Sequence, residues 1–408
     1  MLPIYRIPKK ISELVQDLEM FFTVPQWTHV QTLLLSLLIT PFKPTIVGQS
    51  RVIGAGVHRT KRNEFCQNHD AILVKALRFY AVKLISLLYR KGEPLCVLLD
   101  DSKAKKRGKL VQAAAIMFDH VSKCYLWGHQ FVCITLSYRG MTIPYAIALY
   151  RPKDDCKRRK LPFRKLTSIA EDLIREMPDF GVSTVYVVAD TYFASKRIIQ
   201  SARSKGYHFV TVLKSNRRIL VNGRSTTIKR FIARHFTHQR KHSVHIGNHR
   251  YRTRSQQIYL PGVGEGKLVI SQVKGRTSEL ALFSTQLAAD AASIVAIYRV
   301  RWSIEVFFKL SKQYLGLTAY HHRDERAVRS HLQLVLLAHC LLTHLFIDEQ
   351  RAKDKIISQP LLRKFSLRHA QSRVRSLVTI DALDFLKQQI PRSLEDPFDV
   401  IKSHLIAA

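Results

Sequence analysis

Two aspartates follow short apolar runs in this sequence. The run LCVLLD ends in Asp100, and the run VYVVAD ends in Asp190. Such runs are typical of buried strands, and open α/β sheets place their sites at the carboxyl ends of strands. An acid at that position is costly to remove from water unless it is paired with a cation or binds a metal ion. The alternative is that each aspartate caps a turn or the helix that follows it.

A third carboxylate occurs in a segment with helical periodicity, residues 296–312. On a helical wheel, five polar residues of this segment fall within one stripe of about 80°. They are Tyr298, Arg301, Glu305, Lys309 and Lys312. The ordinary alternative is a solvated face with ion pairs between residues four apart, Arg301 with Glu305 and Glu305 with Lys309. The surplus of cations, the tyrosine and the two upstream aspartates favour a shared site instead.

Together these acids suit metal-dependent phosphodiester chemistry. Two aspartates and a glutamate offer the hard oxygen ligands that Mg²⁺ or Mn²⁺ prefers. Two such ions about 3.5–4 Å apart would activate the attacking water or 3′-hydroxyl and stabilise the leaving oxygen. Neighbouring arginines and lysines could hold phosphates and neutralise the developing charge. The sequence has no Walker-type glycine-rich loop, so ATP use is not indicated.

The spacing of the helical stripe resembles a known signature. Tyr298-x2-Arg301-x3-Glu305-x6-Lys312 is similar to the YREK signature of insertion-sequence DDE transposases, with all four residues at the expected spacing. The surrounding string YRVRWSIEVFFKLSKQYLGL resembles that family's helix. Upstream, LLDDSKAKKRGK and VVADTYFASKRII resemble its first and second aspartate motifs.

This resemblance implies a fold and assigns roles. It implies a ribonuclease-H-like core with a β-rich insertion between the second and third acids. The implied metal ligands, for two Mg²⁺ or Mn²⁺ ions, are Asp100, Asp190 and Glu305. The other three signature residues would contact transposon-end DNA, and cleavage through a hairpin intermediate is also implied by the signature alone. Asp101 is an alternative first ligand, and Asp100 is preferred because it directly follows the apolar run.

Further DNA contacts are predicted near these acids. The basic segment after the first aspartate supplies Lys105, Lys106 and Arg107, and Lys309 lies on the helical stripe. Contacts of this kind position DNA rather than specify its sequence. A single basic run is more often a solvated loop. Trp302 is expected to pack in the core, with stacking on a displaced base as the alternative.

The amino-acid composition limits the kinds of molecule that the protein is expected to bind. Lysine and arginine number 66 against 30 acids, a net charge of +36, and phosphate backbones are the usual partners of such an excess. An apolar content of 46% excludes wholesale disorder. No apolar run reaches about 18 residues, so no membrane partner is expected. Six scattered cysteines without a CxxC pair indicate reduced thiols, and we expect a cytoplasmic protein that associates with the nucleoid.

Alternation of strand and helix patterns predicts an α/β fold with a mixed-sheet, ribonuclease-H-like core and helical ends. The N-terminal helices fit a small DNA-binding bundle, or alternatively a plain helical cap. The predicted domains are a helical N-terminal DNA-binding domain (1–92), the first part of the catalytic core (93–214), a β-strand insertion (215–285), the second part of the core with the YREK helix (286–325) and a helical C-terminal region (326–408).

These features predict a DNA transposase. It would cut transposon ends and join them to target DNA by two-metal-ion hydrolysis and transesterification. Its partners would be double-stranded DNA and a second copy of the chain, because two ends must be brought together. A non-catalytic DNA-binding protein on the same scaffold is one alternative, although it gains nothing from desolvated acids facing an anion. A structure-specific nuclease that cuts without joining is the other.

Overall fold

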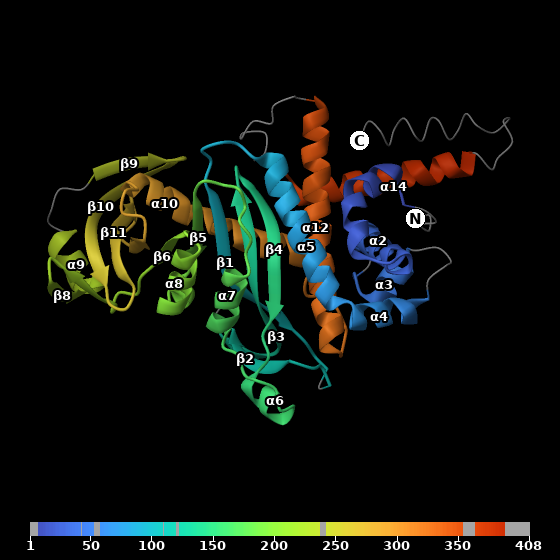
Figure 1. The fold of residues 1–408 in the computed structure, drawn as a ribbon, viewed down its shortest axis with the longest axis horizontal. Coiled ribbons are helices and arrows are strands. Elements are labelled where there is room, and N and C mark those ends of the chain that lie inside the picture. The colour runs from blue at the N-terminus through green and yellow to red at the C-terminus, as the bar shows by residue number, and fades with distance from the viewer. Residues whose placement is uncertain are drawn as a thin grey trace.

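The computed structural model describes residues 7–41, 43–52, 58–108, 110–119, 122–236, 242–353 and 364–387. A large mixed sheet runs through the middle of the molecule, with the N-terminal helices and α12 on one side and the strands of residues 218–273 on the other (Figure 1). The predicted α/β class, with helical flanks and a β-rich segment, is confirmed.

The helices are α1 (Lys9–Val15), α2 (Val24–Ile39), α3 (Ile46–Ser50), α4 (Arg59–Asn68), α5 (Asp70–Leu88), α6 (Lys153–Arg158), α7 (Leu166–Arg175), α8 (Lys196–Ser204), α9 (Ile228–His235), α10 (Ala291–Val300), α11 (Trp302–Tyr314), α12 (Glu325–Lys353) and α14 (Leu367–Lys387), with short 3₁₀ turns η1 (Gln16–Phe21) and η2 (Thr191–Phe193). The strands are β1 (Leu95–Lys105), β2 (Ala115–Asp119), β3 (Cys124–Tyr138), β4 (Met141–Leu149), β5 (Val185–Ala189), β6 (His208–Val212), β7 (Arg218–Val221), β8 (Arg224–Thr227), β9 (His242–Ile246), β10 (His249–Leu260), β11 (Gly264–Val273) and β12 (Glu279–Ser284).

The central strands are those that the apolar runs predict. β1 is antiparallel to β3 and parallel to β5, and β5 is parallel to β6. The hairpin between β3 and β4 turns at Arg139 and Gly140, both with positive φ (51° and 90°), as a primed two-residue turn requires. β1 continues to Lys105, five residues past the end of its apolar run.

The β-rich segment extends the core sheet rather than forming a separate one. Among the described residues, the order is β2-β3-β1-β5-β6-β12-β11-β10-β7-β8, with β4 beside β3 and β9 beside β10. Strand β12 joins the two parts because it pairs with both β6 and β11. The sequence pattern missed α9, a helix within this segment.

Helix α12 is the centre of the helical side of the molecule. It packs against α2, α4, α5, α14 and the edge strand β4. By length and composition it could cross a membrane, but 94% of its most apolar window is buried inside the fold, which makes it a core helix. Its buried face includes His331, His339 and His344 as well as leucines.

The helix with the signature residues departs from the prediction of one continuous helix. It is divided at Arg301 into α10 and α11. There the amide of Arg301 donates to Tyr298 O and the amide of Ile304 donates to Arg301 O, both at 3₁₀ spacing. This tighter turn changes the direction in which the following side chains point relative to an ideal helical wheel.

Candidate active site

Strand pairing brings the first two acids to one edge of the sheet. In the parallel pair β1–β5, Leu99 lies opposite Ala189. Continued by one residue, this register places Asp100 beside Asp190 on the same face, about 5 Å apart at the backbone. Burial raises the pKa of Asp100 to about 7, Arg301 opposes that rise, and the charge of Asp190 adds to it. The two carboxylates therefore act on each other electrostatically.

Asp190 also caps a turn, as the alternative interpretation predicted. Its Oδ1 accepts hydrogen bonds from the amides of Tyr192 (2.9 Å) and Phe193 (3.3 Å), which begin η2. Its carbonyl oxygen accepts from Thr211 Oγ1 at 3.1 Å. These bonds fix the carboxylate at the end of β5 and engage one of its two oxygens. Capping and ligand roles are therefore compatible here.

Arg301 connects the first and third acids. Its Nη1 lies 3.2 Å from Asp100 Oδ2, and its Nη2 donates to Glu305 Oε1. The pair with Glu305 is the local ion pair of a solvated helical face, but the contact with Asp100 joins residues 201 positions apart. All three side chains are at most one-third exposed. A surface salt bridge alone does not account for this arrangement.

Asp101 has a different environment from Asp100. Neighbouring residues of a strand point to opposite faces of the sheet, so Asp101 points away from the face that Asp100 shares with Arg301. Its Oδ2 accepts a hydrogen bond of 2.6 Å from Gln130 Nε2 on β3. The geometry thus places Asp100, and not Asp101, beside the signature residues.

The other residues of the helical stripe differ in their surroundings. Tyr298 is half-buried, and burial together with the charges of Asp190 and Glu305 raises its pKa, against the effect of Arg301. Lys309 and Lys312 are exposed on α11. Trp302 is 64% exposed, so the expectation that it packs in the core is wrong. Trp302 follows Tyr298 by four residues, so it falls beside the polar stripe of the helical wheel and faces outward with it.

The basic segment after the first aspartate divides into two kinds of residue. Lys105 and Arg107 are exposed. Lys106 instead donates to the carbonyl oxygens of Thr318 (3.0 Å) and Tyr320 (2.9 Å), and its ammonium lies 3.2 Å from the centre of the Tyr320 ring. Burial lowers the pKa of Lys106 to about 7. This environment indicates a structural role for Lys106.

The oxygen donors of the site suit a divalent cation, but in this structure the positive charge among them is the guanidinium of Arg301. Asp100, Asp190 and Glu305 offer only hard oxygen donors. The guanidinium of Arg301 lies between two of them. Within the described ranges, no group of three acidic, histidine or cysteine side chains is close enough to hold a metal ion. These residues fit a metal only after Arg301 has moved to another anion.

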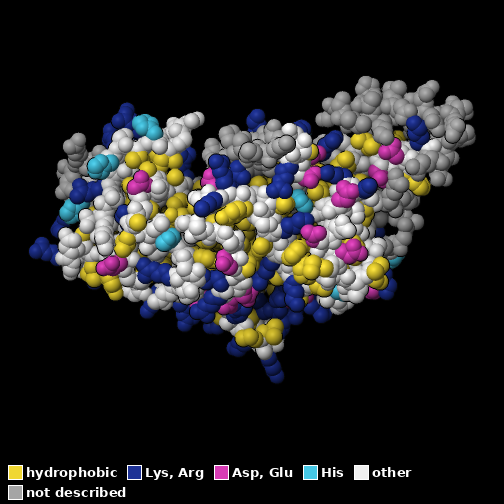
Figure 2. Space-filling model, turned by 45° about the horizontal axis from the view of Figure 1, so that its top comes forward, with side chains coloured by type: hydrophobic (Ala, Val, Ile, Leu, Met, Phe, Trp, Pro, Cys, Tyr) yellow, Lys and Arg dark blue, Asp and Glu magenta, His cyan; other side chains and the backbone are white. Residues whose placement is uncertain are grey.

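Several residues of the site carry no sequence signal of their own. Gln130 and Thr211 contact the aspartates but belong to no recognisable spacing pattern. A basic surface accompanies them: lysines and arginines gather along the lower margin of the molecule's centre (Figure 2). That margin lies where Figure 1 places α6, whose end and following turn carry the exposed basic residues 157–160.

Comparison with known proteins gives consistent matches. Over residues 19–243, more than half of its length, the chain matches the family described as "DDE superfamily endonuclease". Over residues 167–341 it matches the "Transposase DDE domain". Over 97 residues it is 29% identical to "Putative transposase y4zB" of Sinorhizobium fredii, an aligned segment that covers 24% of this chain and 25% of that protein. The two matched ranges together include all three carboxylates.

Proposed function

This chain belongs to the DDE superfamily of endonucleases, and we therefore propose that it is a DNA transposase of the YREK type. It cuts transposon ends and joins them to target DNA. The observation that carries the proposal is the contact of Arg301 with both Asp100 and Glu305, next to Asp190. This contact gathers the acids and the signature arginine at one place.

We assign metal binding to the three carboxylates. Asp100, Asp190 and Glu305 hold divalent cations, Mg²⁺ or Mn²⁺, and we propose two of them. Such ions supply Lewis-acid stabilisation of the charge that develops on the phosphoryl group. Asp100 is preferred to Asp101 because it shares a face of the sheet with Arg301 and Asp190.

We assign DNA binding to the basic and aromatic residues near the site. A phosphate beside the site competes with the carboxylates for Arg301, since a bidentate arginine–phosphate pair is a strong charge-assisted contact. Tyr298, Lys309 and Lys312 lie on the same helices and position the backbone near the cut. Trp302, exposed and adjacent to Arg301, is available to stack on a base.

The chemistry has two steps. Water attacks the scissile phosphorus in line and breaks the bond to the 3′ oxygen, which leaves a 3′-hydroxyl and a 5′-phosphate. The 3′-hydroxyl then attacks a phosphorus of target DNA, forms a new phosphodiester and releases a target 3′-hydroxyl. The chain's residues orient the two phosphates and neutralise their charge.

The proposed chemistry also suggests an oligomeric state, a location and roles for the domains. Two ends must meet, so we propose a homodimer on double-stranded DNA, in the cytoplasm at the nucleoid. We propose that the helices of residues 1–92 bind DNA. We also propose that residues 215–285 act as the insertion between the two parts of the catalytic core, 93–214 and 286–325. Residues 354–363 and 388–408 of the proposed C-terminal region lie outside the described residues.

An Asp190→Asn substitution tests the proposal. Asparagine preserves the turn cap and removes the charge, so DNA cutting in Mg²⁺ should be lost while DNA binding is kept. Asp179→Asn is the matched control, because Asp179 caps an exposed turn before β5 through a 2.9 Å bond from Gly181 N. Full nicking activity in Asp190→Asn refutes the assignment. Joining of pre-cut ends separates a transposase from a nuclease that only cuts.

A further inference from the structure

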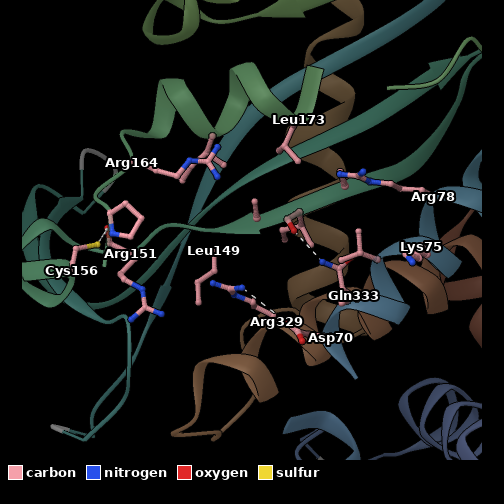
Figure 3. Close-up of a pocket in the computed structure, with 17 residues that line it drawn as sticks. Asp70, Lys75, Arg78, Leu149, Arg151, Cys156, Arg164, Leu173, Arg329 and Gln333 are labelled. Carbon is pink, nitrogen blue, oxygen red and sulfur yellow. Dashed lines mark hydrogen bonds and ion pairs between the residues drawn. The ribbon is translucent and has the colours of Figure 1, made fainter. Parts of the chain in front are cut away.

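A second, separate pocket lies at the edge of the core sheet. It has a volume of about 540 Å³ and is bounded by α5, β4, α7, α12 and the segment between β4 and α7 (Figure 3). That volume falls within the range of small-ligand sites, about 300–1,000 Å³. Nothing in the proposed cutting reaction uses this pocket, so its lining needs its own explanation.

The lining combines apolar walls with cationic groups. Val74, Leu149 and Leu173 are among its apolar residues. Five cations line it against a single acid, Asp70. The cations are Lys75, Arg78, Arg151, Arg164 and Arg329. In Figure 3 Arg164 enters from the α7 side and Arg329 from the α12 side. This arrangement favours an anion attached to an apolar or planar group.

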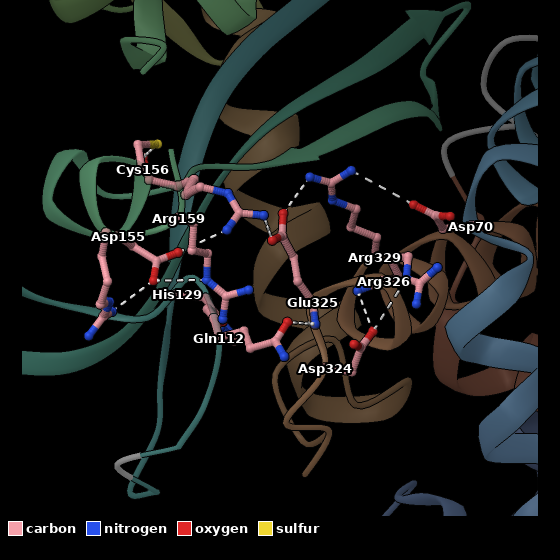
Figure 4. Close-up of polar contacts among 12 residues, drawn as sticks. Asp70, Gln112, His129, Asp155, Cys156, Arg159, Asp324, Glu325, Arg326 and Arg329 are labelled. Carbon is pink, nitrogen blue, oxygen red and sulfur yellow. Dashed lines mark hydrogen bonds and ion pairs between the residues drawn. The ribbon is translucent and has the colours of Figure 1, made fainter. Parts of the chain in front are cut away.

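Buried acids behind the pocket hold its arginines in place. Glu325 is 4% exposed and pairs with both Arg151 and Arg329 (Figure 4). Asp155, also 4% exposed, accepts from Arg151 at 2.9 Å and from Arg158 at 2.8 Å. Because these guanidinium groups are already ordered, a ligand would lose little further side-chain entropy on binding them.

The charges of the pocket and its supporting pairs do not cancel. The cations are Lys75, Arg78, Arg151, Arg158, Arg159, Arg164 and Arg329, and the acids are Asp70, Asp155, Asp172, Glu176 and Glu325. Seven cations against five carboxylates leave a surplus of two, which Arg158 and Arg159 contribute by pairing with Asp155 outside the lining. The five lining cations and the five carboxylates balance. A phosphate monoester carries about −1.5 to −2 near pH 7, whereas a phosphodiester carries only one charge. The monoester therefore competes better than a diester with the carboxylates for the lining cations.

Within the part of the chain that the structure describes, three buried polar atoms of the lining residues have no hydrogen-bond partner. They are Arg78 Nε, Arg329 Nε and Gln333 Oε1. Gln333 is 3% exposed, and its amide nitrogen donates to Ile147 O at 3.0 Å, which leaves the oxygen as an acceptor. Buried polar groups are rarely left unpaired. These atoms have almost no accessible surface, so they make the wall of the pocket polar without offering a ligand a direct contact.

The pocket lies apart from the catalytic carboxylates. Asp101 of β1 pairs with Val132 of β3, which pairs with Ala148 of β4, a residue that lines the pocket. Two strand spacings separate them, about 10 Å, and the pocket lies at the far edge of the sheet, beside β4. A ligand in the pocket is therefore distinct from the scissile phosphate.

We propose that this pocket binds a nucleotide through a terminal phosphate monoester. The phosphate lies among the arginines and Lys75, and the base packs on the apolar walls. Two sources carry this chemistry: a free mononucleotide, and the 5′-phosphate end of a DNA strand. The second source would give the protein a holding place for a phosphorylated end away from the carboxylates.

Binding of paired oligonucleotides tests the pocket without any cutting. A short single strand labelled at its 3′ end is prepared with a 5′-phosphate or a 5′-hydroxyl, and its affinity is measured by fluorescence anisotropy in EDTA. The expected preference for the phosphate is about tenfold. It should disappear in Lys75→Gln, an exposed residue of the pocket, and in Arg329→Gln.

Lys91→Gln is the matched control, because Lys91 is an exposed lysine in the turn before the amino end of β1. It should keep the preference. Competition by dAMP as strong as that of the phosphorylated strand assigns a free mononucleotide, and weaker competition assigns a DNA end. Equal affinity of the wild-type protein for both strands overturns the proposal. The proposal is also overturned if Lys91→Gln loses the preference for the phosphorylated strand as fully as the pocket variants do. Since no metal is present, failure of the nicking assay would leave this result unaffected.

Discussion

Mild acid is expected to unfold this protein, because five histidines are held neutral in its core. Burial lowers the pKa of His331 to about 3. Burial likewise lowers the pKa of His129, His322, His339 and His344 to about 4. In the unfolded chain a histidine has a pKa near 6.5. Between about pH 6.5 and 4, the unfolded chain therefore takes up protons that the folded chain refuses, and stability falls as the pH falls.

The size of the loss in unfolding free energy follows from the shift in the histidine pKa values. For a histidine with a folded pKa of about 4, lowering the pH from about 7.5 to about 5 costs roughly 2 kcal/mol of unfolding free energy. Five such groups together cost at most about 10 kcal/mol, which is comparable to the total stability of a typical domain, about 5–15 kcal/mol. Acid unfolding near pH 5 is the expected outcome.

His339 links this effect to the proposed active site. Its ring contacts the ring of Phe307 edge-on, with centroids 5.1 Å apart, and Phe307 lies on α11 two residues after Glu305. His339→Leu removes one titrating group and retains an apolar side chain against Phe307. The variant should lose about 2 kcal/mol less than the wild type between about pH 7.5 and 5.

Urea unfolding followed by circular dichroism at both pH values measures the difference. His242→Leu is the control, since His242 is exposed and should leave the pH dependence unchanged. An identical acid loss in His339→Leu and the wild type would refute the reasoning that the buried imidazole remains neutral.

Three further outcomes are expected. Gly128→Ala should destabilise the protein by about 3 kcal/mol in urea unfolding, because the new Cβ would lie 2.1 Å from Ala104 O; an unchanged midpoint contradicts this. Glu325→Gln should cost about 3 kcal/mol and lower Tm, because it removes the charge of a buried carboxylate that pairs with Arg151 and Arg329. Asp100→Asn should abolish DNA nicking in Mg²⁺ while Asp101→Asn retains most of it, and the reverse result would reassign the first ligand.

Local patterns predicted much of the fold. Apolar runs ending in Asp100 and Asp190 indicated buried strands, and those strands are neighbours in the sheet because a parallel core is built from such runs. The ribonuclease-H-like α/β class is confirmed by the mixed sheet and by the match to the DDE endonucleases. The hairpin at Gly140 was also predictable, since glycine readily adopts the positive φ that the turn requires.

Local sequence patterns did not predict the tertiary contacts. The helical wheel assumes an unbroken helix, so it missed the 3₁₀ turn at Arg301. Trp302 falls beside the polar stripe on that wheel, in agreement with its exposed position. Lys106 belongs to a basic run, yet its contacts with Thr318 and Tyr320 depend on a segment more than 200 residues away. Glu325 and Arg151, which pair with each other, are also far apart in sequence and have no local signal.

Locating Mn²⁺ in a crystal of the protein with transposon-end DNA tests the central claim most directly. Anomalous scattering should place Mn²⁺ within ligand distance of Asp100, Asp190 and Glu305, about 2.0–2.3 Å, with Arg301 moved onto a DNA phosphate. Mn²⁺ bound elsewhere, while Arg301 still joins Asp100 to Glu305 beside the DNA, would contradict the account.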